Sequence, residues 1–401
     1  MALQQRQRSL LCGGRGLPKL SGGDGPADDP TVSFAALYWD VNTDFDRAAL
    51  TPTTRDWYDL AQQSYAGSGW QVGFTNDLYE AARTLWFHAA GPLTAFLATG
   101  SKDMLVAVNG VAERVLQELD DYDADGYREL VYESSPPAAA WQVGTDDGMD
   151  ANLLAAWLTC VGYLLDRNRA HDEAFGATAD AIADWLFNDY LPEVESEPPG
   201  GGKPLVPDDL THCWARGALW LHFLEKWTGY GAYDEWLSAL KATVFNDLNA
   251  TFLERPNGSL VWDHRPANHP NTLGLHPSIY AGDTLISLVL LAADGALDAA
   301  LLPKLAKTVT HNIFGGEAAF PGAYDVGGGV VLEGEPFKPE GTGITTTITE
   351  GRFSQTGFPA LMAWDDSGII AALVAKARAA GANGMALSGW MVFGRLIDTL
   401  P

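Results

Sequence analysis

Two adjacent carboxylates, Asp146 and Asp147, stand immediately before a long apolar stretch and are the first candidates for catalysis. Carboxylates held close together in a cleft can act as an acid and as a nucleophile or base, because each shifts the pKa of the other. Trp141 precedes the pair and offers an aromatic ring for stacking on a sugar face. The same acids also suit the cap and first turn of a helix, so a structural role stays open.

A second group of candidate residues precedes another apolar stretch. Three of the eight histidines lie in this group, and histidine and tyrosine are side chains that transfer protons in catalysis. The histidine spacing matches no established zinc pattern, although a metal site and a loop of hydrogen-bonding histidines are both alternatives. The group consists of His264, Arg265, Asn268, His269, His276 and Tyr280.

Three further residues are candidates because of the segments that carry them. His212 lies at the start of an apolar segment and is either a site residue or part of the core. Glu350 and Arg352 lie in a late loop that we expect to reach the same site, and a surface ion pair is the alternative for them.

The acidic run from Asp121 to Glu129 has the composition of a calcium-binding loop. Asp121, Asp123 and Asp125 alternate with other residues, a glycine follows, and Glu129 closes the run. Carboxylate oxygens gathered in one tight turn are ligands that Ca²⁺ prefers. The run resembles the first half of an EF-hand loop and departs from it at the twelfth position, which is Tyr132. We therefore weigh a structural Ca²⁺ bound by these four acids against a solvated acidic turn.

The charge balance excludes several classes of partner. The chain has 51 acidic and 25 basic residues, a formal net charge of −26. A nucleic-acid-binding protein needs positive surface to release phosphate counterions, so we expect no nucleic-acid partner. An anionic membrane surface is disfavoured as a partner for the same reason. A polyanionic glycan is disfavoured less strongly, since a local basic cleft can exist.

The sequence contains no phosphate-binding loop and no nucleophile elbow, and no organic cofactor is expected.

The cysteine count and the hydropathy pattern indicate the cellular compartment in which the chain is expected. Three cysteines cannot build a disulfide framework, and Cys160 and Cys213 lie in apolar stretches where they suit a core. No window has the ~18 uninterrupted apolar residues of a membrane span. The first residues do not form a signal-peptide core, so we expect a protein that is cytoplasmic or assembled into a particle.

A recurring unit organises most of the chain. An apolar segment with helical spacing ends in a short polar turn, and an amphipathic segment with helical spacing follows. Two of the turns contain Thr-Gly, at Thr99-Gly100 and Thr228-Gly229, and the turns recur about every 60 to 70 residues. Apolar surface on all sides predicts a buried inner helix, and an amphipathic pattern predicts an outer one.

The expected elements follow from this pattern. The inner helices are expected at 74–97, 147–165, 209–227 and 277–293, and their outer partners at 102–119, 173–187, 233–248 and 297–313. Helices at 366–380 and 385–400 close the chain, and a helix at 55–65 completes the set. Pro256-Asn257-Gly258 predicts a β-hairpin between 251–254 and 259–263. A second small sheet is expected from 327–332 and 345–347.

The helix pairs with Thr-Gly turns and fully apolar inner members resemble the (α/α) toroids, which include glycoside hydrolases, polysaccharide lyases and sugar epimerases. The likeness is architectural, covers about residues 55–400 and includes no full family motif. It implies an all-α toroid of about six helical hairpins with small β-hairpin insertions. It also implies a site in the funnel where the inner helices begin, which is where the candidate residues fall.

The resemblance also implies roles for these residues. The pair Asp146–Asp147 resembles the catalytic acids of endo-mannanase toroids, although the aromatic residues expected after them are absent. Asn268-His269 and Tyr280 resemble the Asn-His pair and the Tyr of toroid lyases, which hold a uronate and remove its C5 proton. The implied activity is cleavage of a polysaccharide by hydrolysis or by β-elimination.

Residues 1–34 are poor in apolar side chains and are expected to form an arm outside a single domain at 35–401. An arm of this composition becomes ordered only against another surface, so a homo-oligomer or a larger assembly is a candidate partner state. The alternative to an enzyme is therefore a non-catalytic structural or glycan-binding component of a particle, filament or surface assembly.

Overall fold

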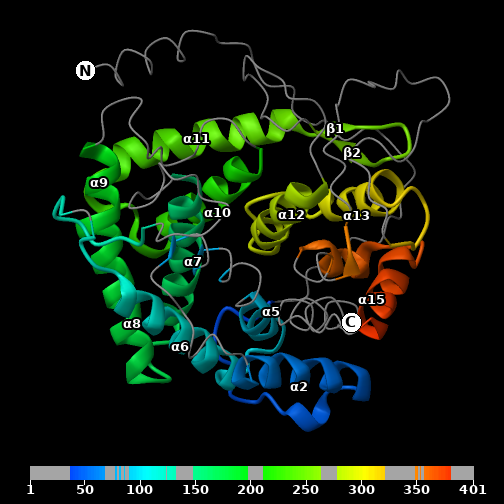
Figure 1. The fold of residues 1–401 in the computed structure, drawn as a ribbon, viewed down its shortest axis with the longest axis horizontal. Helices are drawn as coiled ribbons and strands as arrows, with labels where there is room; N and C mark the ends of the chain where they lie inside the picture. The colour runs from blue at the N-terminus through cyan, green and yellow to red at the C-terminus, as the bar shows by residue number, and fades with distance from the viewer. Residues whose placement is uncertain are drawn as a thin grey trace.

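The structure is a computed structural model that describes most of the chain between residues 37 and 380 (Figure 1). The described residues are 37–67, 77–78, 81–82, 85, 90–122, 124–131, 148–196, 211–262, 278–320, 348–350, 353 and 356–380. The expected arm, the expected second sheet and the expected helix at 385–400 lie outside them.

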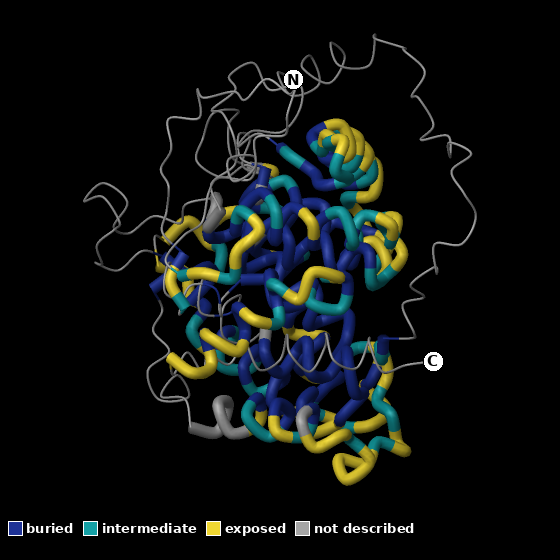
Figure 2. Tube along the Cα trace, turned by 90° about the vertical axis from the view of Figure 1, so that its right-hand side faces the viewer, coloured by how far each residue is buried: buried dark blue, intermediate teal, exposed yellow. Residues whose placement is uncertain are grey.

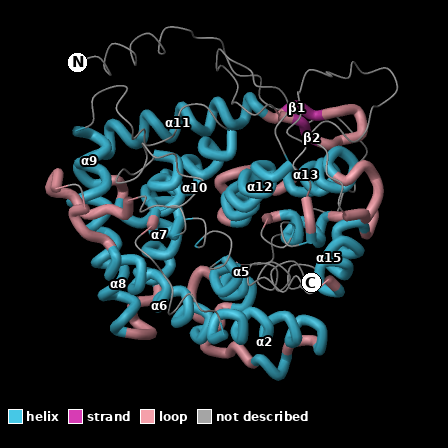
Figure 3. The backbone as a smooth tube through the Cα atoms, viewed as in Figure 1, coloured by secondary structure: helices cyan, strands magenta, loops and turns pink. Residues whose placement is uncertain are grey.

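The described part of the chain is mostly helical, with 71% of its residues in helices, which confirms the expected all-α class (Figure 3). Within it, none of the helices combines the length and the apolar composition that crossing a membrane requires.

Four helix pairs follow one another, as the apolar pattern predicts. The pairs are α5 (Ala90–Thr99) with α6 (Lys102–Glu118), α7 (Gly148–Arg167) with α8 (Glu173–Trp185), α10 (Thr211–Thr228) with α11 (Asp234–Thr251), and α12 (Ser278–Ala293) with α13 (Leu301–Lys307). Helix α2 (Pro52–Gly67) precedes them and α15 (Ile369–Ala379) follows. Shorter elements are η1 (Arg47–Ala49), η3 (Leu186–Tyr190), α9 (Leu191–Ser196), η4 (Gly231–Tyr233), η5 (Thr308–Ile313) and η6 (Phe358–Trp364).

The two Thr-Gly turns end their helices with the same hydrogen bonds. The hydroxyls of Thr99 and Thr228 each donate to the carbonyl four residues earlier, and each accepts the N–H two residues later. Gly100 and Gly229 adopt φ values of +66° and +62°, the left-handed conformation in which glycine avoids a Cβ clash. Thr-Gly thus caps the C-terminus of a buried helix and starts the return.

Burial separates the first member of each pair from the second. Every residue of α7 from Asp150 to Leu165 is buried, and α5 and α12 are buried almost as completely. The second members alternate between buried and exposed positions. Figure 1 shows α5, α7, α10 and α12 nearer the middle of the view, and Figure 2 shows buried backbone inside and exposed backbone at the margins. The predicted inner and outer roles are therefore confirmed for these helices.

Three inner helices run in the same direction. Helix α10 packs against both α7 and α12. Near their C-terminal ends, the Tyr163 ring of α7 lies 5.3 Å from the Phe223 ring of α10. Asp294, the residue after α12, accepts hydrogen bonds from Lys226 of α10. Since neighbouring helices meet through their C-terminal ends, their N-terminal ends share the opposite side.

Residues 37–42, which we call the crossing segment, connect the C-terminal ends of the inner helices. Its backbone N–H groups donate to the carbonyls of Leu97 and Gly100, at the end of α5. The buried amide of Asn168, just after α7, accepts from Val41 N–H at 2.6 Å and donates to the Trp39 carbonyl at 3.0 Å. The Trp39 ring also lies 5.5 Å from the Phe223 ring of α10. We call this side of the helices the closed end and the side of their N-termini the opposite end.

Strands occur among the described residues only in the predicted hairpin. Strands β1 (Leu253–Glu254) and β2 (Leu260–Val261) pair antiparallel, and Gly258 in the turn has a φ of +77°. Thr308 anchors the hairpin, because its hydroxyl accepts the Leu260 N–H at 2.8 Å and donates to the Leu260 carbonyl at 2.9 Å.

The first and the last described helices also meet. The Arg378 guanidinium of α15 lies 4.6 Å from the centre of the Trp57 ring of α2, a distance at which cation and ring attract. The two ends of the helical region are therefore in contact across more than 300 residues of sequence.

We predict that Asn168→Ala lowers the free energy of unfolding by about 3 kcal/mol, because it removes one buried and two part-buried hydrogen bonds and leaves backbone groups of the crossing segment unpaired. Asn188→Ala is the matched control, since Asn188 is exposed and makes one side-chain hydrogen bond, to Asp184. Urea denaturation measures both, and equal midpoints would contradict the role given to Asn168.

Candidate functional site

Polar side chains are buried in the first two turns of the three parallel inner helices. Five such residues, each at most 5% exposed, lie at the opposite end of these helices. Buried polar groups are retained in proteins where they bind partners or ligands. They are Asp150 and Asn152 of α7, Thr211 and Arg216 of α10, and Thr284 of α12.

These five residues were not among the sequence candidates, although each lies close to one. Asp150 follows the Asp146–Asp147 pair, and Arg216 follows His212 on the same helix. The signal in the sequence is a polar residue inside an apolar helical run, which is also the pattern of a helix cap. Only the shared direction of the helices places the five residues at one end.

Of the glycan-site candidates, the structure describes the side chains of Tyr280 and Glu350. His212 is the second residue of α10, and its side chain is outside the described set. The remaining candidates lie outside the described residues, and their roles stay predictions. They are Trp141, Asp146, Asp147, His264, Arg265, Asn268, His269, His276 and Arg352.

Tyr280 lies in the first turn of α12, and 36% of it is exposed. Glu350 is half-buried in a segment that continues to α12, where the Gly357 N–H donates to the Gly282 carbonyl at 3.3 Å. These two segments approach closely because Gly282 has no side chain: a Cβ there would lie 2.5 Å from Thr356 Cγ2. The chain therefore contacts α12 seven residues after Glu350, which is itself helical and not part of the expected loop, and the expected approach of Glu350 to the site stays a prediction.

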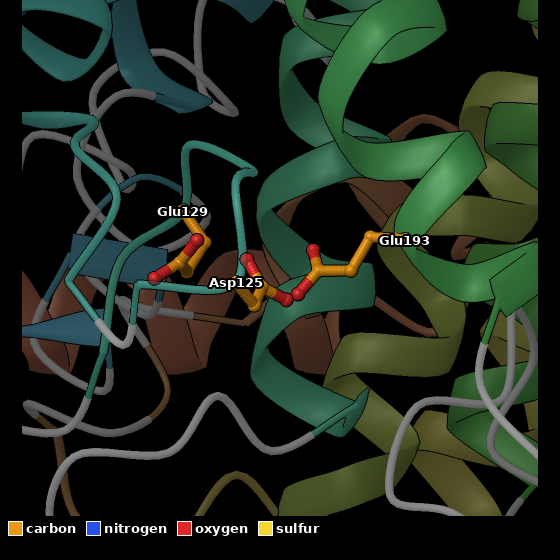
Figure 4. A group of neighbouring side chains, drawn as sticks. All are labelled: Asp125, Glu129 and Glu193. Carbon is orange, nitrogen blue, oxygen red and sulfur yellow. The ribbon is translucent and has the colours of Figure 1, made fainter.

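A separate acidic group combines two predicted metal ligands with one that the sequence missed. Carboxylate oxygens of Asp125, Glu129 and Glu193 all lie within 4.8 Å of one another (Figure 4). Glu129 and Glu193 are 6% and 2% exposed, and Asp125 is exposed. Asp121 does not belong to the group, and Asp123 lies outside the described residues.

Backbone pairing and an ion pair hold this loop against its neighbours. Glu129 pairs with Asp120 across an antiparallel bridge, and its carboxylate accepts the Tyr122 N–H at 3.1 Å. Arg128 donates to the buried Asp189 carboxylate from its backbone N–H at 3.1 Å and from its guanidinium at 2.6 Å. Asp189 lies in η3, four residues before Glu193 on α9. The pair between Arg128 and Asp189 thus brings Glu129 close to Glu193.

Three carboxylates at this separation repel one another, and burial of two of them strengthens the repulsion. The group contains the oxygen ligands that suit a divalent cation such as Ca²⁺.

Comparison with known proteins does not extend this picture. No family model matches the chain, no curated protein matches it, and no solved structure matches it. The site is therefore argued from the geometry of this chain alone.

We predict that Asp189→Ala lowers the free energy of unfolding by about 2 kcal/mol, because Arg128 loses its buried partner while keeping part of its solvation. The control is Asp184→Ala, which removes the more exposed partner of the same guanidinium and should cost less than about 0.5 kcal/mol. Thermal and urea denaturation separate the two variants, and a larger loss in Asp184→Ala would contradict the proposed anchor.

Proposed function

We propose that this chain is a glycan-active enzyme built on a closed (α/α) toroid, with its site at the N-terminal ends of the inner helices. The observation that carries the proposal is the shared direction of α7, α10 and α12, which places their buried polar side chains at one end. The crossing segment covers the other end, so a ligand would enter from the side of the helix starts.

Two sets of contacts support closure of the ring. Arg378 of α15 lies over the Trp57 ring of α2, and α2 packs on α5, the first inner helix. At the other side of α12, η6 packs on α12, α13 and α15. Together these contacts extend the row of helices from α12 round to α5.

The proposed chemistry takes one of two forms. In hydrolysis, Asp146 or Asp147 protonates the leaving oxygen, and the other acts as nucleophile or base. In β-elimination, His269 or Tyr280 removes the C5 proton while Asn268 and Arg265 hold the uronate. The exposed position of Tyr280 at the start of α12 is compatible with contact to a substrate.

The other candidates have supporting places in this proposal. His212 adds a proton-transfer or hydrogen-bonding group from α10, and Trp141 offers a stacking surface. His276, Glu350 and Arg352 provide polar contacts to the glycan, and the contact of Gly357 with Gly282 of α12 supports a place for Glu350 near that helix.

A non-catalytic component of a particle, filament or surface assembly is the second candidate function. It is favoured by the burial of polar groups near the starts of α7 and α10, where Asn152 and Thr211 are 0% exposed. A toroid that serves as a scaffold needs no open funnel.

The prediction for the enzyme is reducing-end release from at least one member of a panel of neutral and uronic polysaccharides. Hydrolysis releases reducing ends alone, whereas elimination also produces an unsaturated sugar that absorbs in the ultraviolet. Asp146→Asn should lower a hydrolytic rate, or His269→Gln an eliminating rate, by at least about 100-fold.

His171→Gln is the control for this prediction, because His171 is exposed in the turn between α7 and α8 at the closed end. A chain that is folded but inactive on the whole panel would contradict the proposed enzyme and favour the non-catalytic structural component.

We also propose that Asp125, Glu129 and Glu193 hold one structural Ca²⁺. Calorimetry should detect Ca²⁺ binding that Glu193→Gln and Asp125→Asn weaken at least about tenfold, because each removes one charged ligand. Ca²⁺ should raise the unfolding temperature of the wild type above its value in chelator.

Asp121→Asn decides between the two ligand sets. An unchanged Ca²⁺ affinity supports the ligand group that contains Glu193. A loss of Ca²⁺ affinity equal to that of Asp125→Asn supports instead the ligand set predicted from the sequence, which includes Asp121. Equal thermal stability with Ca²⁺ and with chelator contradicts both.

A further inference from the structure

Three aromatic rings lie in contact at the surface, where η3, η4 and α11 meet. The rings of Phe187 and Tyr233 are nearly parallel, with 27° between their planes and 6.2 Å between their centres. The Trp236 ring lies 6.1 Å from the Tyr233 ring at an angle of 59°. All three side chains are half-buried: they pack against the core and are still in contact with solvent. We call these three rings the aromatic platform.

The geometry of the parallel pair leaves part of each ring uncovered by the other. Carbon atoms in contact are about 3.5–4 Å apart, so rings stacked directly on each other have centres at about that distance. A separation of 6.2 Å between nearly parallel rings therefore includes a large lateral offset. Two offset rings that are also in contact with solvent form a flat apolar surface on which another flat group can pack.

The turn that carries Tyr233 holds its ring in a fixed place. Residues 229–231 all adopt left-handed φ values, between +53° and +62°, and the middle one, Tyr230, is not a glycine. This conformation is unfavourable for tyrosine, and it persists because Tyr230 is fully buried and its hydroxyl donates to the Leu221 carbonyl at 2.6 Å. The Tyr233 N–H in turn donates to the Tyr230 carbonyl at 3.0 Å. Backbone strain of this kind gathers at functional sites.

Phe187 is positioned from two sides. Its ring lies against Gly231, where a Cβ would be 3.6 Å from Phe187 Cε1. On the other side, Arg128 binds Asp189, two residues after Phe187, from its backbone N–H and its guanidinium. This pair also brings Tyr127, the neighbour of Arg128 in the chain, to the same part of the surface. The aromatic platform is therefore assembled by contacts between segments far apart in the sequence.

Polar groups border the platform. Burial raises the pKa of the Tyr233 hydroxyl, and the nearby Glu195 and Tyr127 add to this rise. The Tyr233 hydroxyl therefore keeps its proton at neutral pH and can donate a hydrogen bond, while the exposed Glu195 carboxylate can accept one. Asp234 and Glu235 begin α11 directly after Tyr233 and add negative charge. An apolar surface is thus combined with hydroxyl groups and carboxylates at its edge.

We propose that the aromatic platform binds a neutral glycan chain. A sugar ring has C–H groups on its faces, which pack on aromatic rings, and hydroxyls at its edge, which hydrogen-bond to Glu195 and to the two tyrosine hydroxyls. The carboxylates beside the platform repel the negative charge of a uronate, so the neutral sugar is the ligand that fits. This surface uses none of the residues of the proposed catalytic site, so the proposal holds for an enzyme and for a non-catalytic protein alike.

A protein partner fits this surface less well. A standard protein interface buries about 800 Å² on each partner. Aromatic side chains bury about 150–250 Å² each when they are fully covered, and these three are already half-buried, so the platform offers far less than that area. A second copy of the chain would also bring together two molecules of net charge −26.

The test uses the full chain on native gels that each contain one polysaccharide, at about 0.15 M salt. The neutral probes are galactomannan, xyloglucan, mixed-linkage glucan and dextran, and the anionic probes are polygalacturonate and alginate. At least one neutral probe should slow the wild type more than either anionic probe does. Phe187→Leu and Tyr233→Leu keep an apolar side chain but remove the ring, so each should weaken this binding at least about fivefold.

Phe245→Leu is the matched control, because Phe245 is a half-buried aromatic residue of α11 that lies more than two turns beyond Trp236. It should bind as the wild type does. Glu195→Ala should weaken binding roughly threefold or more, as expected for one lost hydrogen bond. Since Glu195 is exposed, this variant tests the surface even if a ring variant fails to fold.

Four results would overturn the proposal. They are binding to none of the probes, tighter binding of an anionic probe, an equal loss in Phe245→Leu, and self-association that Phe187→Leu abolishes. Asp146→Asn and His269→Gln should bind the neutral probe as the wild type does, so a chain without enzymatic activity still tests the platform. Binding that these two variants lose and Phe187→Leu keeps would assign the glycan to the proposed catalytic site and overturn the platform.

Discussion

The helices of this protein depend on how the last carbonyls of its buried inner helices find hydrogen-bond partners. A helix end that is buried without partners is costly, because four carbonyls lose water and gain nothing in return. Here the threonine of a Thr-Gly turn donates back into the last turn of α5 and of α10. Asn168 and the crossing segment serve α5 and α7. With these groups satisfied, the three apolar helices α5, α7 and α10 can end in the interior.

The two ends of the helix group consequently differ in chemistry. The closed end combines aromatic rings, paired charges and backbone hydrogen bonds among the described residues. The opposite end contains buried polar side chains at the starts of helices, where backbone N–H groups and the helix dipole favour anionic or polar groups. Stability and proposed function thus occupy different ends of the same helices, as they do in other folds whose sites are built from loops on a rigid frame.

Much of the helical layout could be predicted from sequence, because burial on all sides and amphipathicity leave different patterns. The boundaries of α7, α10 and α12 fall within two residues of expectation, and the hairpin follows from Pro256-Asn257-Gly258. The candidate site was less predictable. Glu193 joins Asp125 and Glu129 through the Arg128–Asp189 pair, which spans 61 residues and leaves no local pattern. Asn168 resembled an ordinary turn residue, since its partners lie 127 and more residues away.

The crossing segment has a consequence for how the chain is made. Its residues leave the ribosome before any of the helices that it joins, and Trp39 must wait for Phe223, more than 180 residues later. The segment can bind the end of α5 and Asn168 as these emerge, but its contact with α10 comes last, and contacts of such long sequence separation form slowly. The nascent chain can build its early helix pairs one after another, but the closed end can assemble only after α10 has emerged. This order leaves the apolar ends of the earlier inner helices exposed until α10 has emerged and makes chaperone binding during synthesis a physical expectation for this fold.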